Sequence, residues 1–197
     1  MCYITCRVFP ILGFVFGFVS DDVDVNLTVL YRVVHRHRKS YVGSYKIYYS
    51  TVDSMVHYET KTGLTKSSTA FPPNASCVLL HLHRDLQFIV AFLRGMPSLK
   101  SHEKLSGIAA EAYDGTLAAY HGWTVRMGIS AAMYTLPTKH ELVVGMGLGM
   151  KNEGEIKNTL DQFCGKLKCV FDRVQAILTQ YNALNLSQPP LEQYRSC

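Results

Sequence analysis

The sequence lacks most of the short motifs that mark an enzyme or a metalloprotein. None of its six cysteines form a Cys-x-x-Cys pair, and none has a histidine partner at zinc-site spacing, so neither a zinc site nor another metal site is expected. The glycine-rich run at 145–149 lacks Gly-x-Gly-x-x-Gly spacing and follows no strand pattern, which excludes a dinucleotide-binding loop. A P-loop, a paired-carboxylate motif and a Ser/His/Asp order in a strand–turn–helix context are also missing. We therefore expect no catalytic site and no cofactor.

The sequence also lacks an unbroken apolar run of about twenty residues, the length that a bilayer requires. Its longest is VFPILGFVFGFV at residues 8–19, which is too short to span but has the size of a signal-peptide core, with Arg7 as a weak positive flank. No small-x-small cleavage site follows, because the chain continues into Ser-Asp-Asp-Val-Asp. Two interpretations stay open: the start of a core helix, which we favour, and a signal or anchor.

The composition is that of a folded domain. The chain has 197 residues, of which 48% are hydrophobic and only 18% charged, which excludes a disordered chain and allows a sizeable core. The net charge of +5 permits attraction to anionic membranes or nucleic acid but requires neither. Six cysteines without a pairing pattern are expected to be free thiols in a reducing compartment.

Helical periodicity dominates the chain. Apolar residues recur at three- and four-residue steps over 12–34, 79–93 and 156–184, and a shorter helix is expected at 51–62. A Ser/Thr/Pro-rich stretch at 63–76 is typical of a linker that ends in a helix cap at Ser76. Internal repeats and convincing strand hairpins are missing from the sequence. The pattern predicts an all-α fold.

The segment EAYDGTLAAYHGWTVRMGISAAMYTLP at 111–137 is the most informative stretch. It predicts two helices, within about 105–136, that meet at a His121-Gly-Trp123 corner. Small residues at 109, 110, 112, 115, 118 and 119 leave a low-volume face that another group can approach closely. His121 is either a ligand-binding group or a satisfied core or surface histidine.

A second group of polar residues interrupts apolar helix faces. Asp22 and Asn26 are four residues apart and share a face with valines, where an unpaired polar group costs roughly 1–3 kcal/mol. They either bond to other helices, lie at an exposed helix end, or bind a ligand. His81 lies at the edge of the next apolar face and could pair with Asp85, while Arg84 and Asp85 are expected to be solvated or structural.

Such a polar set suits an amphiphile. A carboxylate accepts hydrogen bonds from amide N–H and hydroxyl groups, and an imidazole N–H donates to a carbonyl. The amide of a ceramide presents these groups beside two alkyl chains, and burying the chains contributes about 0.8 kcal/mol per CH₂.

Three blocks together carry a family resemblance: GFVFGFVSDDVDVNL, LLHLHRDLQFIVAFLRGM, and AYDGTLAAYHGW followed by TLPTKHEL. The chain resembles the glycolipid transfer protein superfamily, nearest its ceramide-1-phosphate branch, from about residue 11 to 184. The resemblance implies a two-layer, all-α sandwich that parts to admit lipid chains. The family has about one more helix before Gly13, so the expected fold lacks that first helix. We expect a lipid-transfer domain at 8–186 and a tail at 187–197.

The resemblance also assigns roles to individual residues. It implies that Asp22 binds the ceramide amide and headgroup and that His121 bonds to the amide carbonyl. Asn26 and His81 fall on headgroup positions. Position 26 is Asn in the family's glycolipid binders and usually Lys in its phosphate binders, whereas position 81 is Trp or Arg, and position 77 matches an arginine of the phosphate binders. With Asn26, Cys77 and His81 in these places, the choice between sugar and phosphate is open.

Trp123 matches the surface tryptophan with which family members enter the membrane interface. The alternative for this residue is a core tryptophan. The basic segment 32–46 is either a contact for anionic lipid or a solvated loop.

The leading hypothesis is a non-enzymatic sphingolipid transfer protein for ceramide-1-phosphate or a related ceramide lipid. It is expected to be a monomer in the cytoplasm that docks transiently on membranes; the secretory pathway is the alternative if residues 1–19 act as a signal or anchor. The second hypothesis is a lipid-binding sensor or scaffold with impaired transfer. A third, a helical nucleic-acid binder that uses residues 31–49, is disfavoured because basic runs with tyrosines are unspecific.

Overall fold

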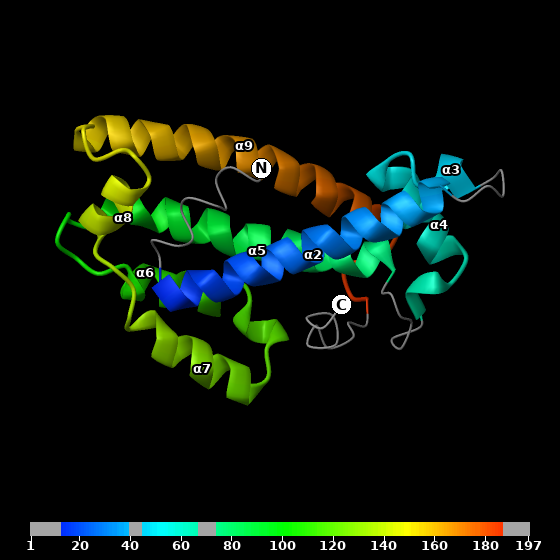
Figure 1. Cartoon of the computed structure of the whole chain (residues 1–197), viewed down its shortest axis with the longest axis horizontal. Coiled ribbons are helices and arrows are strands. Elements are labelled where there is room, and N and C mark those ends of the chain that lie inside the picture. The colour runs from blue at the N-terminus through cyan, green and yellow to red at the C-terminus, as the bar shows by residue number, and fades with distance from the viewer. Residues whose placement is uncertain (1–12, 40–44, 67–73, 187–197) are drawn as a thin grey trace. The chain divides into compact units, whose positions relative to one another are not determined.

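The computed structural model describes residues 13–39, 45–66 and 74–186, with side chains described at 23–36, 47–66 and 74–186. These residues form helices, short 3₁₀ turns and loops, with one isolated bridge between Lys104 and Thr138 and no strand (Figure 1). The all-α prediction is therefore confirmed. The chain divides into two compact units, unit 1 (residues 1–21 and 84–169) and unit 2 (residues 22–83 and 170–197).

Unit 2 is built around the part of helix α2 (Gly13–Lys39) that begins at Asp22, with α3 (Tyr45–Tyr48), α4 (Val52–Lys61) and the 3₁₀ turn η2 (Leu64–Lys66). The first part of α5 (Ala75–Gly95) and the last part of α9 (Glu153–Gln180) complete it. On α2, Val23, Asn26 and Val33 are all buried, as expected of one helical face. The core of the unit contains Val33, Tyr49, Met55, Val56, Ala75, Leu79, Leu80, Leu178 and Ala183.

A buried carboxylate joins α4 to the start of α5. Glu59 is 1% exposed, and its two oxygens accept hydrogen bonds from the Ala75 N–H at 3.0 Å, the Ser76 N–H at 2.7 Å and the Ser76 hydroxyl at 2.6 Å. The hydroxyl of Tyr49 donates to it at 2.8 Å. The N-terminus of a helix carries unsatisfied N–H groups and a partial positive charge, so a carboxylate is favoured there.

The first turn of α5 corrects the predicted cap. The side chain of Asn74, rather than Ser76, accepts from the Cys77 N–H at 2.9 Å, and the helix begins at Ala75. Ser76 instead lies inside the helix with its hydroxyl bonded to Glu59. The sequence signal was ambiguous because Asn and Ser are both good cap residues two positions apart.

Unit 1 contains the rest of α5, the 3₁₀ turn η3 (Met96–Ser98), α6 (Ser106–Asp114), η4 (Ala118–Tyr120), α7 (Trp123–Met133), α8 (Lys139–Gly145) and the start of α9. Its core is lined by large side chains with almost no exposure: Phe88, Phe92, Met96, Leu105, Leu136, Leu142 and Leu160. The two helices predicted at 105–136 are α6 and α7, but η4 lies between them.

Helix α5 with its η3 extension (Ala75–Ser98) is the one described helix that is long and apolar enough to cross a bilayer. Most of its apolar window is buried in the protein, as in the central helix of a globular core.

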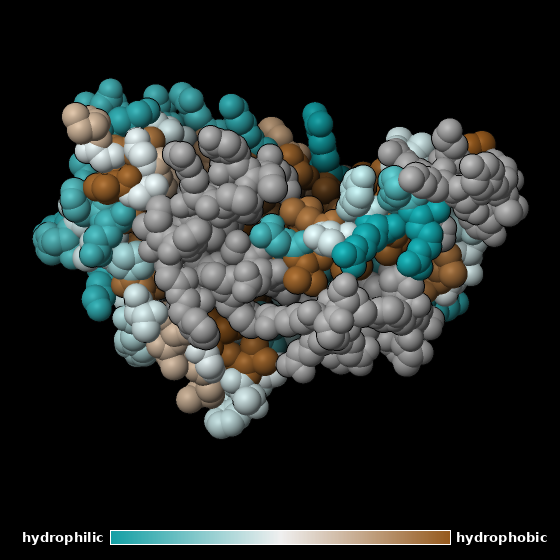
Figure 2. Space-filling view, in the orientation of Figure 1, coloured by the Kyte–Doolittle hydropathy of each residue, from teal (hydrophilic) through white to brown (hydrophobic). Residues whose placement is uncertain are grey.

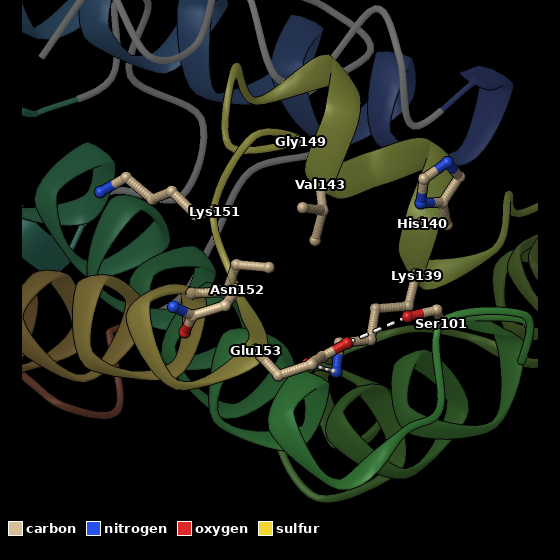
Figure 3. Close-up of a pocket in the computed structure, with 9 residues that line it drawn as sticks. Ser101, Lys139, His140, Val143, Gly149, Lys151, Asn152 and Glu153 are labelled. Carbon is tan, nitrogen blue, oxygen red and sulfur yellow. Dashed lines mark hydrogen bonds and ion pairs between the residues drawn. The ribbon is translucent and has the colours of Figure 1, made fainter.

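A buried lysine fastens α8 to the start of α9 in unit 1. Lys139 is 2% exposed, and its ammonium donates to the Leu99 carbonyl at 2.8 Å and to the Glu153 carboxylate at 2.7 Å. Glu153 also accepts from the Ser101 hydroxyl at 3.0 Å (Figure 3). Because a buried ammonium is stable only when it is paired, these bonds fix the loop after η3 against both helices.

Candidate functional site

His121 lies at the predicted corner in unit 1. It follows η4 in an extended conformation (φ −106°, ψ 137°), and Gly122 leads directly into α7. The imidazole is half-buried, and its Nδ1 lies 2.8 Å from the hydroxyl of Tyr113 on α6. Burial lowers the pKa of His121, and burial is also the main cause that raises the pKa of Tyr113. Both groups are therefore neutral at pH 7, so the pair can offer a ligand one imidazole N–H or one ring nitrogen.

A second contact holds the residue before His121. The guanidinium of Arg84 on α5 lies over the ring of Tyr120, 3.6 Å from its centroid. Arg84 is 8% exposed, so of the two expectations the solvated side chain is wrong, while a structural role fits this stacking. Sequence reasoning assigned no role to Tyr113 or Tyr120. The order Ala-Tyr before Thr-Leu-Ala-Ala-Tyr-His contained both residues, but nothing in it identified their partners.

The other candidate residues belong to unit 2. Asn26 is 1% exposed on the inner face of α2, which contradicts the alternative of an exposed helix end at this residue. The side chain of Asp22, one turn earlier, lies outside the described side chains. His81 is partly buried on α5. The predicted pairing of Asp22 with His121 at one lipid amide joins residues of different units and stays a prediction.

Polar groups near His81 on α5 are more buried than the sequence suggested. His83 is 5% exposed, and its Nε2 lies 2.6 Å from the side-chain oxygen of Gln175 on α9. Its ring stacks on Phe171 at 4.2 Å between centroids. In unit 1, Asp85 is 9% exposed and thus not the solvated residue that was one of the two expectations.

Trp123 begins α7 and is 76% exposed, so the alternative of a core tryptophan is wrong. Further apolar side chains close to it in sequence are exposed on or beside α7: Tyr120, Val125, Met127 and Tyr134. At the position of α7, the space-filling view shows mostly pale and brown side chains (Figure 2). We call this set, with Trp123, the α7 patch.

A separate pocket in unit 1 does not match the candidate lipid site. It has a volume of about 210 Å³ and is lined mainly by polar side chains, among them Ser101, Lys139, His140, Asn152 and Glu153 (Figure 3). Drug-sized ligands occupy cavities of roughly 300–1,000 Å³ with mostly apolar walls. Lys139 and Glu153 on its wall pair with each other, and Lys151 donates to the Thr159 hydroxyl. In the part of the chain that the structure describes, no three His, Cys, Asp or Glu side chains gather as metal ligands would.

Comparison with known families gives one match that covers most of the chain. The family model described as glycolipid transfer protein matches residues 1–147. The ceramide-1-phosphate transfer protein of Rattus norvegicus is 31% identical over 179 residues, which cover 89% of this chain and 79% of that protein. The protein of the same name from Xenopus laevis is 30% identical over 180 residues, covering 89% and 78%.

Solved structures agree with the sequence comparison. Human ceramide-1-phosphate transfer protein in complex with 12:0 ceramide-1-phosphate superposes with a TM-score of 0.76 at 27% identity, over 91% of this chain and 83% of that chain. The lipid-free mouse protein gives 0.74 at 29% identity, over 89% and 81%. A fungal glycolipid transfer protein gives 0.66 at 21% identity, over 89% and 79%, a likeness of fold alone.

Proposed function

The chain belongs to the glycolipid transfer protein family, and from this premise we propose that it binds a sphingolipid and carries it between membranes without changing it chemically. The observation that carries the proposal is the neutral His121 at the corner before α7, held through one ring nitrogen by Tyr113. A neutral imidazole fixed in this way suits hydrogen bonding to a lipid amide better than acid–base catalysis, which needs a pKa near the working pH.

In this proposal the lipid amide is held by two complementary groups. The carboxylate of Asp22 accepts from the amide N–H, and His121 donates to the amide carbonyl. Asn26 is one turn from Asp22 and presents an amide that can both donate and accept, so it suits the polar region beside the ceramide. The apolar chains supply most of the affinity, at about 0.8 kcal/mol for each buried CH₂ group.

We take ceramide-1-phosphate or a related ceramide lipid as the substrate, because the relatives carry that lipid in their names. A phosphate headgroup binds best to arginine or lysine. The three headgroup positions carry Asn26, Cys77 and His81, and of these only His81 can become cationic. We therefore expect weaker selectivity for phosphate than three arginine or lysine contacts would give.

Membrane docking is assigned to the α7 patch. Aromatic side chains favour the bilayer interface, and Arg126 lies exposed on the same helix beside Trp123 and Val125, where it can meet anionic headgroups. We propose that the protein docks in this way as a monomer, peripherally and reversibly, on cytoplasmic membrane faces.

The alternative function is a lipid sensor or scaffold that binds but transfers poorly. It is favoured by Cys77, which occupies a headgroup position and is 2% exposed, so this position gives a phosphate neither charge nor access. Loss of phosphate contacts at the headgroup positions lowers lipid affinity but leaves the fold intact.

A vesicle assay with native mass spectrometry separates these possibilities. Transfer of fluorescent ceramide-1-phosphate is measured for the wild type, for Asp22→Val and His121→Ala, and for the exposed-histidine control His102→Ala. We expect the wild type and the control to carry lipid and transfer it, and both site variants to lose lipid while keeping helical circular dichroism. Lipid retained without transfer indicates the sensor, whereas no lipid and no transfer in the wild type reject both functions.

A further inference from the structure

The hydrogen bond between Tyr113 and His121 has a direction that matters for the ligand. Its length of 2.8 Å is compatible with either group as donor. If the phenol donates, Nδ1 is the acceptor and the ring proton is on Nε2. We propose that Tyr113 is a positioning residue that keeps His121 in the Nε2-protonated tautomer, so that the imidazole presents one N–H to a lipid carbonyl. This inference rests on the proposed function only for the identity of that carbonyl.

The contact geometry and the relative acceptor strengths favour the phenol as donor, and the two pKa shifts are consistent with it. Tyr113 is 3% exposed and burial raises its pKa, with Asp114 adding to the rise and Arg126 opposing it, so the hydroxyl keeps its proton. Burial lowers the pKa of His121, so the imidazole is neutral and has one unprotonated nitrogen. The lone pair of that nitrogen is a stronger acceptor than a phenol oxygen, whose own lone pair is delocalised into the ring.

The opposite direction would leave His121 unsuited to the proposed role. With Nδ1 protonated and donating to Tyr113, Nε2 would present a lone pair. A carbonyl oxygen also presents lone pairs, so the two would repel. A neutral histidine can donate to a carbonyl through Nε2 only when Nδ1 carries no proton, and a donor at Nδ1, the position that Tyr113 occupies, favours that tautomer.

Neighbouring side chains hold Tyr113 and the residue before His121 in place. The Tyr113 ring packs in the unit 1 core with Ala109, Ala112, Leu117 and Ala118. On the other side, Tyr120 is stacked under the Arg84 guanidinium at 3.6 Å. His121 is thus fixed at its ring by Tyr113 and at the preceding residue by Arg84, which limits rotation of the imidazole. This is the arrangement expected of a group that must bind in one orientation.

The tautomer can be observed in the lipid-free protein. Long-range ¹H–¹⁵N correlation spectra of histidine-labelled protein, recorded above pH 7, report which ring nitrogen carries the proton. We expect the wild type to show a protonated Nε2 and an unprotonated, hydrogen-bonded Nδ1 at His121. Tyr113→Phe should give a mixture of both tautomers at His121. The control Tyr31→Phe, at a tyrosine that is 69% exposed and stacks on His35, should leave the His121 signals unchanged. A proton on Nδ1 in the wild type, or no change in Tyr113→Phe, overturns the proposal.

Binding of short-chain ceramide-1-phosphate tests the consequence. Tyr113→Phe keeps the ring and its packing but removes the hydrogen bond that orients the imidazole. Because one such bond contributes about 1 kcal/mol, the change should weaken lipid binding about fivefold. His121→Ala should weaken it at least as much, and adding Tyr113→Phe to it should have little further effect, because Tyr113 acts through His121. Wild-type affinity in Tyr113→Phe contradicts the positioning role. Wild-type affinity in His121→Ala would instead reject the proposed lipid site. The tautomer spectrum separates failure of the site from failure of the positioning role, because it is recorded without lipid.

Discussion

His121 links the fold to pH, because its pKa is lower in the folded protein than in the unfolded chain. Below about pH 6.5 the unfolded chain takes up a proton at this histidine that the folded protein takes up only at lower pH. The stability that this residue contributes is therefore complete above pH 6.5 and is lost as pH falls toward the folded pKa. We expect the wild type to lose more stability between pH 7 and pH 5 than His121→Asn does, as measured by urea unfolding. Equal losses in the two proteins would contradict a lowered pKa of His121 in the folded protein.

Single residues were identified from sequence only where their own type was informative. Asn26 and His121 interrupt apolar or small-residue patterns, and both are at least partly buried in the structure. Tyr113 and Arg84 each act through a partner that is close in the fold but not marked as a partner in the sequence. A buried tyrosine on an apolar face is indistinguishable from a core residue until its hydroxyl is seen to bond. The role of Asp22 remains a prediction.

At the scale of helices, Glu59 is the connection whose loss should be most costly. Glu59→Gln removes the negative charge from the N-terminus of α5 and replaces one acceptor oxygen with an N–H₂ group that faces backbone donors. We expect this change to lower the free energy of unfolding by about 2–3 kcal/mol, because hydrogen bonds to charged groups are worth about 1.5–3 kcal/mol. Chemical denaturation measures the effect, with the exposed Glu111→Gln as the matched control. A loss below about 0.5 kcal/mol would show that the carboxylate is not needed there.

The existence of the helices followed from apolar periodicity, whereas their junctions did not. The helix expected at 51–62 is α4 (Val52–Lys61), and the apolar repeat at 79–93 lies within α5 (Ala75–Gly95). The cap of α5 was misplaced because Asn74 and Ser76 are both good capping residues, and the bond of the Ser76 hydroxyl to Glu59, seventeen residues earlier, has no signal in the sequence. The turn η4 was missed because a 3₁₀ turn of three residues has no periodicity of its own. Residues 40–44, within the basic segment 32–46, lie outside the described residues, so its interpretation as a solvated loop stays a prediction.

For the whole molecule, the predicted glycolipid-transfer-type helical fold is confirmed by the match to family structures at TM-scores up to 0.76. The sequence supported this prediction because three separated blocks agreed with one family at once. Composition and periodicity alone would have supported only an all-α domain. Headgroup selectivity could not be derived in the same way, because it depends on a few side chains that differ from the family pattern at positions 26, 77 and 81.

Transfer between membranes requires the whole protein to reach a bilayer, and the α7 patch provides a test of how it does so. Trp123 is 76% exposed at the start of α7, where its side chain contributes to no described core contact, so Trp123→Ala should leave the fold intact. Moving a tryptophan from water into the bilayer interface is favourable by roughly 1.5–3 kcal/mol at most, the range for burying a large apolar side chain. We therefore expect about tenfold weaker partitioning onto vesicles and correspondingly slower lipid transfer.

The affinity of Trp123→Ala for soluble short-chain ceramide-1-phosphate should stay at the wild-type value, because the change affects docking and not the amide contacts. The matched control is Tyr31→Ala, which removes an aromatic ring of similar exposure (69%) from α2 in unit 2. Vesicle sedimentation and transfer rates measured on both variants separate a local docking surface from general surface hydrophobicity. Equal losses in the two variants would mean that exposed aromatic area anywhere drives membrane contact. A loss confined to Trp123→Ala would place the docking surface on α7, on the same chain segment as His121, so that membrane contact and lipid recognition would be separated by one glycine in sequence.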